Sequence, residues 1–182
     1  MNGRTQKIVT CAMLTAVTAL LSLIAIPMPS MIPVSLQCFA VALCGYFAGS
    51  LMGTVSVIVY ILIGTVGVPV FAGMRGGFAV IFGATGGFIF GFIPLCLLCG
   101  GFGLSKKVGK CRHITAITLG ITGLVLCHLC GIIQFMLVMG ADLATAFLSA
   151  SLPYIIKDII CVLLSYPVSN ILKKAVRNVH SV

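Results

Sequence analysis

An acidic and a basic residue stand side by side in SLPYIIKDIICVLLSYPVSNIL, an otherwise apolar stretch near the carboxyl end of the sequence. Lys157 and Asp158 fall about one helical turn after Pro153, which suits the start of a helix. An ionisable group is costly inside an apolar helix and usually marks the path of a ligand or ion. We expect Asp158 to face inward and Lys157 to extend along its stem to the edge of the apolar region. The alternative is an ion pair that only anchors the helix end.

A stretch rich in glycine and phenylalanine, GVPVFAGMRGGFAVIFGATGGFIFGF, is the second place where the sequence could contact a ligand. Glycine lets the backbone approach a ligand closely or adopt a positive φ. The phenylalanine rings supply apolar walls, and Arg75 is the one charged side chain of the stretch. The stretch therefore predicts a loop that lines a binding cavity.

Two glycine motifs come close to a phosphate-binding loop, but neither matches it. GATGG is followed by no lysine, and GLSKKVGKC has five residues before GK and then Cys111. A phosphate-binding loop needs four residues and then Ser or Thr. With two acidic residues in the whole chain, the usual binding of Mg-ATP is also excluded. We expect no enzyme activity, and any energy that the chain uses must come from another protein.

The elements that position these residues are predicted to be membrane helices. The chain has 182 residues, of which 60% are hydrophobic and 7% charged, too few polar side chains to cover a soluble globule. We predict an all-α integral membrane protein with a single domain over residues 1–182. Crossing the bilayer takes roughly 20 apolar residues, which gives six spans, at about 7 to 27, 36 to 51, 53 to 68, 84 to 101, 114 to 138 and 153 to 172.

The net charge of +9 is explained by topology and does not require nucleic acid as a partner. The basic residues cluster before the first span, between the fourth and fifth, and after the sixth. Six spans place all three clusters on one side, which the positive-inside rule assigns to the cytoplasm together with both termini. Arg75, Asp142, Lys157 and Asp158 then lie towards the outer surface. The clusters consist of Arg4 and Lys7; Lys106, Lys107, Lys110 and Arg112; and Lys173, Lys174 and Arg177.

Nine cysteines, with CLLC at 96 to 99 and CHLC at 127 to 130, raise the possibility of a metal or thiol site. The first pair is predicted near the cytoplasmic end of the fourth span, whereas Cys127 is about 20 Å into the fifth. The two pairs should not meet. We expect no metal and no cofactor, and we expect His128 to hydrogen-bond a neighbouring helix.

Three stretches share a pattern with one family of membrane proteins: IPMPSMIPVSLQCFAVALCGYFAG, GVPVFAG with FGATGGFIFGF, and LPYIIKDII. In these stretches and in its six spans, the chain resembles BioY, the biotin-specific membrane component of energy-coupling factor (ECF) vitamin transporters. It departs from the family's pattern at Ala84, where members commonly have Pro, at Lys157, where they have Gly, and at Cys161, where they have Lys. The Asp that members have in this pattern is present here as Asp158.

The resemblance implies a substrate-binding subunit that captures biotin at its outer face in a bacterial cell membrane. The partners that it implies are a transmembrane coupling protein and two ATPase subunits. In AMLTAVTAL, Ala12 and Ala16 lie one turn apart on one face, and the resemblance identifies them as a docking surface for the coupling protein. Two alternatives stay open, namely a subunit of the same architecture for another vitamin and a stand-alone facilitator.

Biotin offers a cyclic urea, an apolar sulfur ring and a carboxylate, and the chain has candidates for each. The ring could pack on Phe71, Phe78 and Tyr154. The urea could hydrogen-bond to Gln37, Thr85 and Asp158. Backbone N–H groups around Gly73, Gly86 and Gly87 could meet either polar end. For the carboxylate we expect Arg75 first and Lys157 second.

Overall fold

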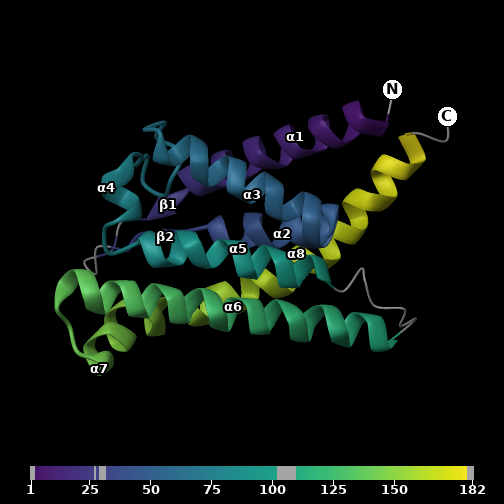
Figure 1. Cartoon of the computed structure of the whole chain (residues 1–182). Coiled ribbons are helices and arrows are strands. Elements are labelled where there is room, and N and C mark those ends of the chain that lie inside the picture. The colour runs from purple at the N-terminus through teal and green to yellow at the C-terminus, as the bar shows by residue number, and fades with distance from the viewer. Residues whose placement is uncertain (1–2, 27, 29–31, 102–109, 180–182) are drawn as a thin grey trace.

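A computed structural model describes residues 3–26, 28, 32–101 and 110–179 (Figure 1). Most of these residues are helical. In chain order the elements are α1 (Gly3–Leu23), β1 (Ala25–Ile26), β2 (Val34–Ser35), α2 (Gln37–Ala48), α3 (Ser50–Thr65), α4 (Phe78–Ile81), α5 (Gly86–Gly101), α6 (Lys110–Met139), α7 (Leu143–Ala146), the π-helical turn η2 (Phe147–Ser151) and α8 (Leu152–Val179).

Each of the six predicted spans overlaps one of the longer helices α1, α2, α3, α5, α6 and α8, although the first was predicted to run beyond the end of α1 at Leu23. The prediction of an all-α chain needs one correction, because β1 and β2 form a small antiparallel sheet in which Ala25 pairs with Ser35. The short helices α4 and α7 and the turn η2 were not predicted either. Asp142 begins α7: its carboxylate accepts a hydrogen bond from the Thr145 N–H, and its contacts with Thr145 hold its pKa below the usual range.

Apart from the four-residue helices α4 and α7, the helices fall into two length classes. The stretches Gly3–Leu23, Cys111–Met139 and Leu143–Asn178 are long and apolar enough to cross a membrane. The apolar helices α2, α3 and α5 have 12, 16 and 16 residues. At 1.5 Å per residue they reach about 18 to 24 Å, less than the roughly 30 Å of a bilayer's hydrocarbon core.

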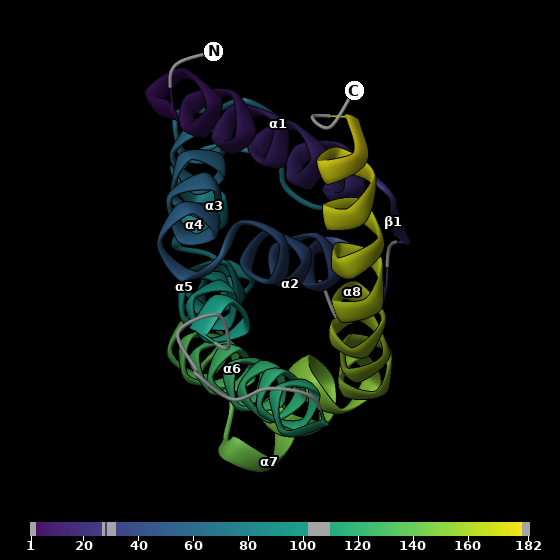
Figure 2. The same ribbon diagram turned by 90° about the vertical axis from the view of Figure 1, so that its right-hand side faces the viewer.

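Helix α2 lies at the centre of the bundle, with α1, α3, α5 and α8 packed around it (Figure 2). Its sequence, QCFAVALCGYFA, is almost wholly apolar, as expected of a helix that is buried on all sides. Tyr46, which is fully buried, donates a hydrogen bond to the Ala116 carbonyl of α6 at 3.0 Å. A single residue, Gly49, connects α2 to α3 with a φ of 83°, a value that disfavours other residues.

The bundle has two chemically different ends. The start of α1, the start of α6 and the last turns of α8 lie at one end, and these segments carry Arg4, Lys7, Arg112, Lys173, Lys174 and Arg177 (Figure 1). The opposite end is formed by the sheet, α4 and α7. Lys106 and Lys107 lie outside the described residues. We call the end that is formed by the sheet, α4 and α7 the loop end, and it holds the candidate site.

Candidate functional site

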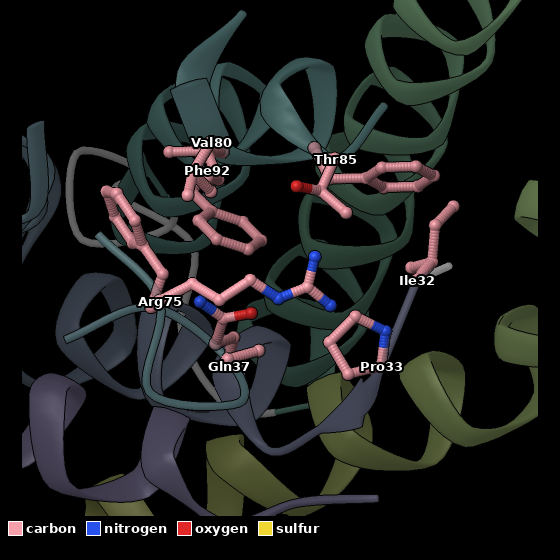
Figure 3. Close-up of a pocket in the computed structure, with 11 residues that line it drawn as sticks. Ile32, Pro33, Gln37, Arg75, Val80, Thr85 and Phe92 are labelled. Atoms are coloured by element: carbon pink, nitrogen blue, oxygen red, sulfur yellow. The ribbon is translucent and has the colours of Figure 1, made fainter. Parts of the chain in front are cut away.

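A pocket at the loop end gathers four of the predicted ligand contacts (Figure 3). Gln37 comes from the start of α2, Phe71 and Arg75 come from the turn after α3, and Thr85 immediately precedes α5. The rest of the lining is mainly apolar and consists of Ile32, Pro33, Ala72, Val80, Phe88, Ile89 and Phe92. The enclosed cavity measures about 40 Å³. Figure 3 shows the Arg75 side chain lying across it, with Gln37 and Pro33 on one side and Thr85 on the other.

A tight turn places Arg75 over the pocket. The Phe71 N–H donates to the Arg75 carbonyl at 2.9 Å, and the Arg75 N–H donates back at 3.3 Å. Gly73 and Met74, at the tip, have positive φ values of 72° and 57°. Glycine adopts this conformation without steric cost, which explains why Gly73 suits the turn. Gly73 therefore shapes the loop and is not part of the pocket lining.

Phe71 anchors the same turn in the core. Its side chain is buried and meets the ring of Tyr60 edge to face, with centroids 5.6 Å apart. A side chain at Gly64 of α3 would collide with the Phe71 ring, so the missing side chain makes room for it. Phe71 is thus both a wall of the pocket and the residue that fixes the loop.

Gln37 belongs to a chain of buried hydrogen bonds. Its Nε2 donates to the Tyr60 hydroxyl at 2.8 Å, and that hydroxyl donates to the Val70 carbonyl at 3.0 Å. Its Oε1 accepts from the Ser35 hydroxyl at 3.0 Å. Both ends of the amide are held, so Gln37 presents a fixed orientation beside the pocket. Sequence reasoning missed Ser35 and Tyr60, although polar side chains in apolar membrane segments are themselves a signal of such contacts.

Asp158 is buried, with 4% of its surface exposed, as predicted. The expectation for Lys157 was wrong. Its Nζ lies 2.5 Å from Asp158 Oδ1 and donates to the Ser35 carbonyl at 2.7 Å, so the side chain points inward. The carboxylate and the carbonyl stabilise the Lys157 ammonium group more than solvation at the membrane interface would. Asp158 does not line the pocket itself, but Lys157 and Ser35 connect it to Gln37.

His128 on α6 supports Asp158 from the other side. His128 Nε2 lies 3.4 Å from Asp158 Oδ2, and His128 Nδ1 lies 2.8 Å from the Ser151 hydroxyl of η2. The prediction that His128 bonds to a neighbouring element is confirmed. These contacts link α6 and α8 through one polar cluster of Ser35, His128, Ser151, Lys157 and Asp158, in which only Lys157 is not fully buried. We call it the charged cluster.

Tyr154 lies next to the pocket and is not part of its wall. Its hydroxyl donates to the Ile32 carbonyl at 2.5 Å. Ile32 lines the pocket, so this bond fixes one edge of it against α8.

Three other predicted contacts lie outside the pocket. Phe78, on α4, is 65% exposed and faces away from the core. Gly86 and Gly87 begin α5, and side chains there would collide with the Ile81 carbonyl and with Cys130 of α6. Gly87 therefore lets α5 and α6 pack closely, and Gly86 makes room for the end of α4. Gln134 of α6, another polar residue that was missed, donates to the Ile81 and Gly83 carbonyls at 2.7 and 2.8 Å and holds the loop in place.

The docking and metal predictions concern other surfaces. Ala12 and Ala16 are both exposed on α1, beside the face formed by its buried residues Leu14, Thr15, Thr18 and Ser22. Within the described ranges, no three His, Cys, Asp or Glu side chains gather in an arrangement that could hold a metal ion. Cys96 and Cys99 are buried against α2, where they pack beside Gly45.

The pocket therefore combines a cation, two polar side chains and apolar walls. A guanidinium binds carboxylate through charge-assisted hydrogen bonds, and Gln37 and Thr85 can both donate and accept. Such a set suits a small ligand with an apolar body, a polar end and an anionic end.

Comparison with known proteins agrees with these features. Residues 1–178 match the model of the BioY family. A probable biotin transporter BioY of Pyrococcus horikoshii is 36% identical over 71% of this chain and 73% of its own length. The biotin transporter BioY2 of Lactococcus lactis is 31% identical over 87% of this chain and 85% of its own.

One solved structure has the same fold. It is described as the S-component for biotin from an ECF-type ABC transporter, and it superposes with a TM-score of 0.84 at 25% identity, over 95% of this chain and 93% of that one. Family and fold together identify a mostly helical, multi-pass membrane transporter protein. The chain belongs to the BioY family.

Proposed function

We propose that this chain is the S component that captures biotin for an ECF-type ABC transporter. One observation carries the proposal: in a BioY family member, four residues selected from sequence for biotin contact line one pocket, namely Gln37, Phe71, Arg75 and Thr85. The relatives are named as biotin transporters, which favours biotin over other vitamins.

Within the pocket we assign the biotin carboxylate to Arg75, the cation that lies across it. The ring system packs on Phe71, and the urea bonds to Gln37 and Thr85. Asp158 acts behind this wall, because it holds Lys157 against the Ser35 carbonyl beside Gln37. A cavity of about 40 Å³ is well below the roughly 300 to 1,000 Å³ of ligand pockets, so binding requires the Arg75 side chain, which lies across the cavity, to move outward.

We further propose that the single domain crosses the membrane six times, with both termini in the cytoplasm. The basic residues of α1, α6 and α8 lie at one end of the bundle, which supports this orientation under the positive-inside rule. The short helices α2, α3 and α5 would then cross with the help of loops or a locally thinner bilayer. Reporter tags at the amino end, between α5 and α6, and at the carboxyl end should all be cytoplasmic, and an externally labelled tag would contradict the topology.

The proposed partners are a transmembrane coupling protein and two ATPase subunits. The exposed pair Ala12 and Ala16 offers a surface where a partner helix could approach closely. Purified alone, the chain should hydrolyse no ATP, since its glycine motifs lack the residues of a phosphate-binding loop.

Calorimetry with a panel of vitamins tests the ligand. We expect saturable binding of biotin and none of the others, and tight binding of a different vitamin instead would overturn the assignment. The Arg75 contact is tested with biotin and its uncharged amide. Arg75→Gln should weaken biotin by about 10- to 100-fold and the amide much less.

Arg177→Gln is the matched control, because it removes an arginine from the opposite end. It should leave both affinities unchanged. If Arg75→Gln weakens biotin and the amide equally, Arg75 does not bind the carboxylate, whereas the choice of biotin as ligand would still stand.

A further inference from the structure

A basic cleft lies between the start of α6 and the last turns of α8, at the end opposite the pocket. Its volume is about 510 Å³, against about 40 Å³ for the pocket. Seven residues line it: Arg112, His113, Tyr166, Asn170, Lys173, Lys174 and Arg177. We call it the basic cleft.

The basic cleft concentrates positive charge that the chain's own carboxylate side chains cannot balance. Four of its residues are Arg or Lys, and like charges this close together repel one another. The whole sequence contains two acidic residues. Asp142 caps α7, and Asp158 pairs with Lys157, two helical turns or about 12 Å from Tyr166. An external anion would lower the repulsion within the cleft.

The inner wall of the basic cleft is built from aromatic residues. The Tyr166 hydroxyl and His113 Nδ1 are hydrogen-bonded at 2.7 Å, with ring centroids 5.6 Å apart. Tyr166 also meets Tyr46 of the central helix edge to face, at 5.2 Å. The wall is therefore joined to the core, and the Tyr166–His113 hydrogen bond links α6 to α8 at this end.

The two helix segments that form the cleft also carry exposed apolar side chains. Ile114 on α6 and Ile171, Leu172 and Val176 on α8 are all exposed, within a few residues of the cleft's cations. A free phosphate ion would contact only the polar lining of the cleft. An amphiphile with a phosphate group and acyl chains could also contact exposed apolar side chains of the same helix segments, which would give it more buried surface.

We propose that the basic cleft binds the phosphate headgroup of an anionic phospholipid of the cytoplasmic leaflet. Arg and Lys hold phosphate through charge-assisted hydrogen bonds, and basic pockets between membrane helices are a recognised form of headgroup site. The assignment to that leaflet rests on the proposed topology and not on biotin as the substrate. Inorganic phosphate shares the headgroup's chemistry, so the experiment separates the two sources.

The test measures the thermal unfolding temperature of delipidated protein in neutral detergent. Three additions are compared, namely phosphatidylglycerol, phosphatidylcholine and inorganic phosphate. We expect phosphatidylglycerol to raise the unfolding temperature at low concentration and the other two not to. Equal protection by inorganic phosphate would assign the cleft to a soluble anion, and equal protection by phosphatidylcholine would show that charge is not recognised; either result overturns the proposal.

A pair of variants with the same change in net charge locates the effect. Arg112→Gln/Lys173→Gln should raise the half-saturating phosphatidylglycerol concentration by about tenfold or more. Arg4→Gln/Lys7→Gln, on α1 and outside the cleft, should change it little. Equal changes in the two variants would mean general surface attraction and would refute the site.

If the cleft variant does not fold, Lys173→Arg/Lys174→Arg keeps the charge and should retain lipid binding, whereas Lys173→Gln/Lys174→Gln should lose it. Retention by both variants would refute the site. Biotin affinity, measured on the same samples, should be unchanged in every variant, so a failure of the lipid proposal leaves the biotin proposal intact.

Discussion

The two ends of the bundle treat charge in opposite ways. At the loop end, Lys157 and Asp158 are paired, His128 and Ser35 lie next to them, and the charged cluster is largely buried. At the other end, cations line the basic cleft, which is open and has a volume of about 510 Å³. Burial makes charge balance within the protein obligatory, because an unpaired charge is costly there. At the basic end, solvent and lipid headgroups can supply the balance.

The largest expected effect comes from breaking the balance at the loop end. Asp158→Leu leaves Lys157 without its carboxylate and should lower the free energy of unfolding by about 3 kcal/mol. The double variant Lys157→Met/Asp158→Leu should recover most of this loss, because neither charge is then buried alone. Unfolding in mixed micelles measures both variants.

The matched change at the basic end is Lys174→Met, which removes an exposed cation. It should lower the free energy of unfolding by less than about 0.5 kcal/mol.

The loop-end prediction is contradicted if Lys157→Met/Asp158→Leu is no more stable than Asp158→Leu. That result would show that the stabilities contributed by Lys157 and Asp158 do not depend on each other.

A smaller effect is expected from α1, a third surface that belongs to neither end. Ala12→Leu/Ala16→Leu should reduce biotin uptake by cells by about tenfold and leave biotin affinity unchanged, because added bulk separates the docking helices. Met13→Leu, an exposed neighbour of similar volume, should preserve uptake. Normal uptake by the double variant would remove the docking assignment.

The smallest effect distinguishes two buried tyrosines. Tyr60→Phe removes the hydroxyl that holds Gln37, and Tyr46→Phe removes a hydroxyl that bonds to Ala116. Each should cost about 1 kcal/mol of unfolding free energy. Only Tyr60→Phe should also weaken biotin, by about fivefold in calorimetry. Equal biotin affinities would mean that the Gln37 contacts do not matter to the pocket.

The helices could be predicted because long apolar runs bounded by glycine, proline or charge leave few alternatives. The paired strands β1 and β2 could not, since two residues each carry no recognisable periodicity. The inward direction of Lys157 was also beyond the sequence, because the Ser35 carbonyl that attracts it is 122 residues away.

The glycines show the same limit for the site. A glycine can face a ligand or another helix, and nothing in the local sequence separates these uses. Gly86 and Gly87 turned out to pack against neighbouring backbone and side chains. Arg75 and Gln37 were predictable because a charge or an amide in an apolar surrounding needs partners.

The one-residue joint at Gly49 has a consequence for the order of assembly. Joining the central helix to α3 through a single residue costs little loop-closure entropy, and Gly53 lets the two helices approach closely at Cys44 and Gly45. Both helices are also synthesised early. We therefore expect α2 and α3 to form a helical hairpin while the second half of the chain is still being synthesised. Helices α5, α6 and α8 would then pack against a hairpin that is already folded.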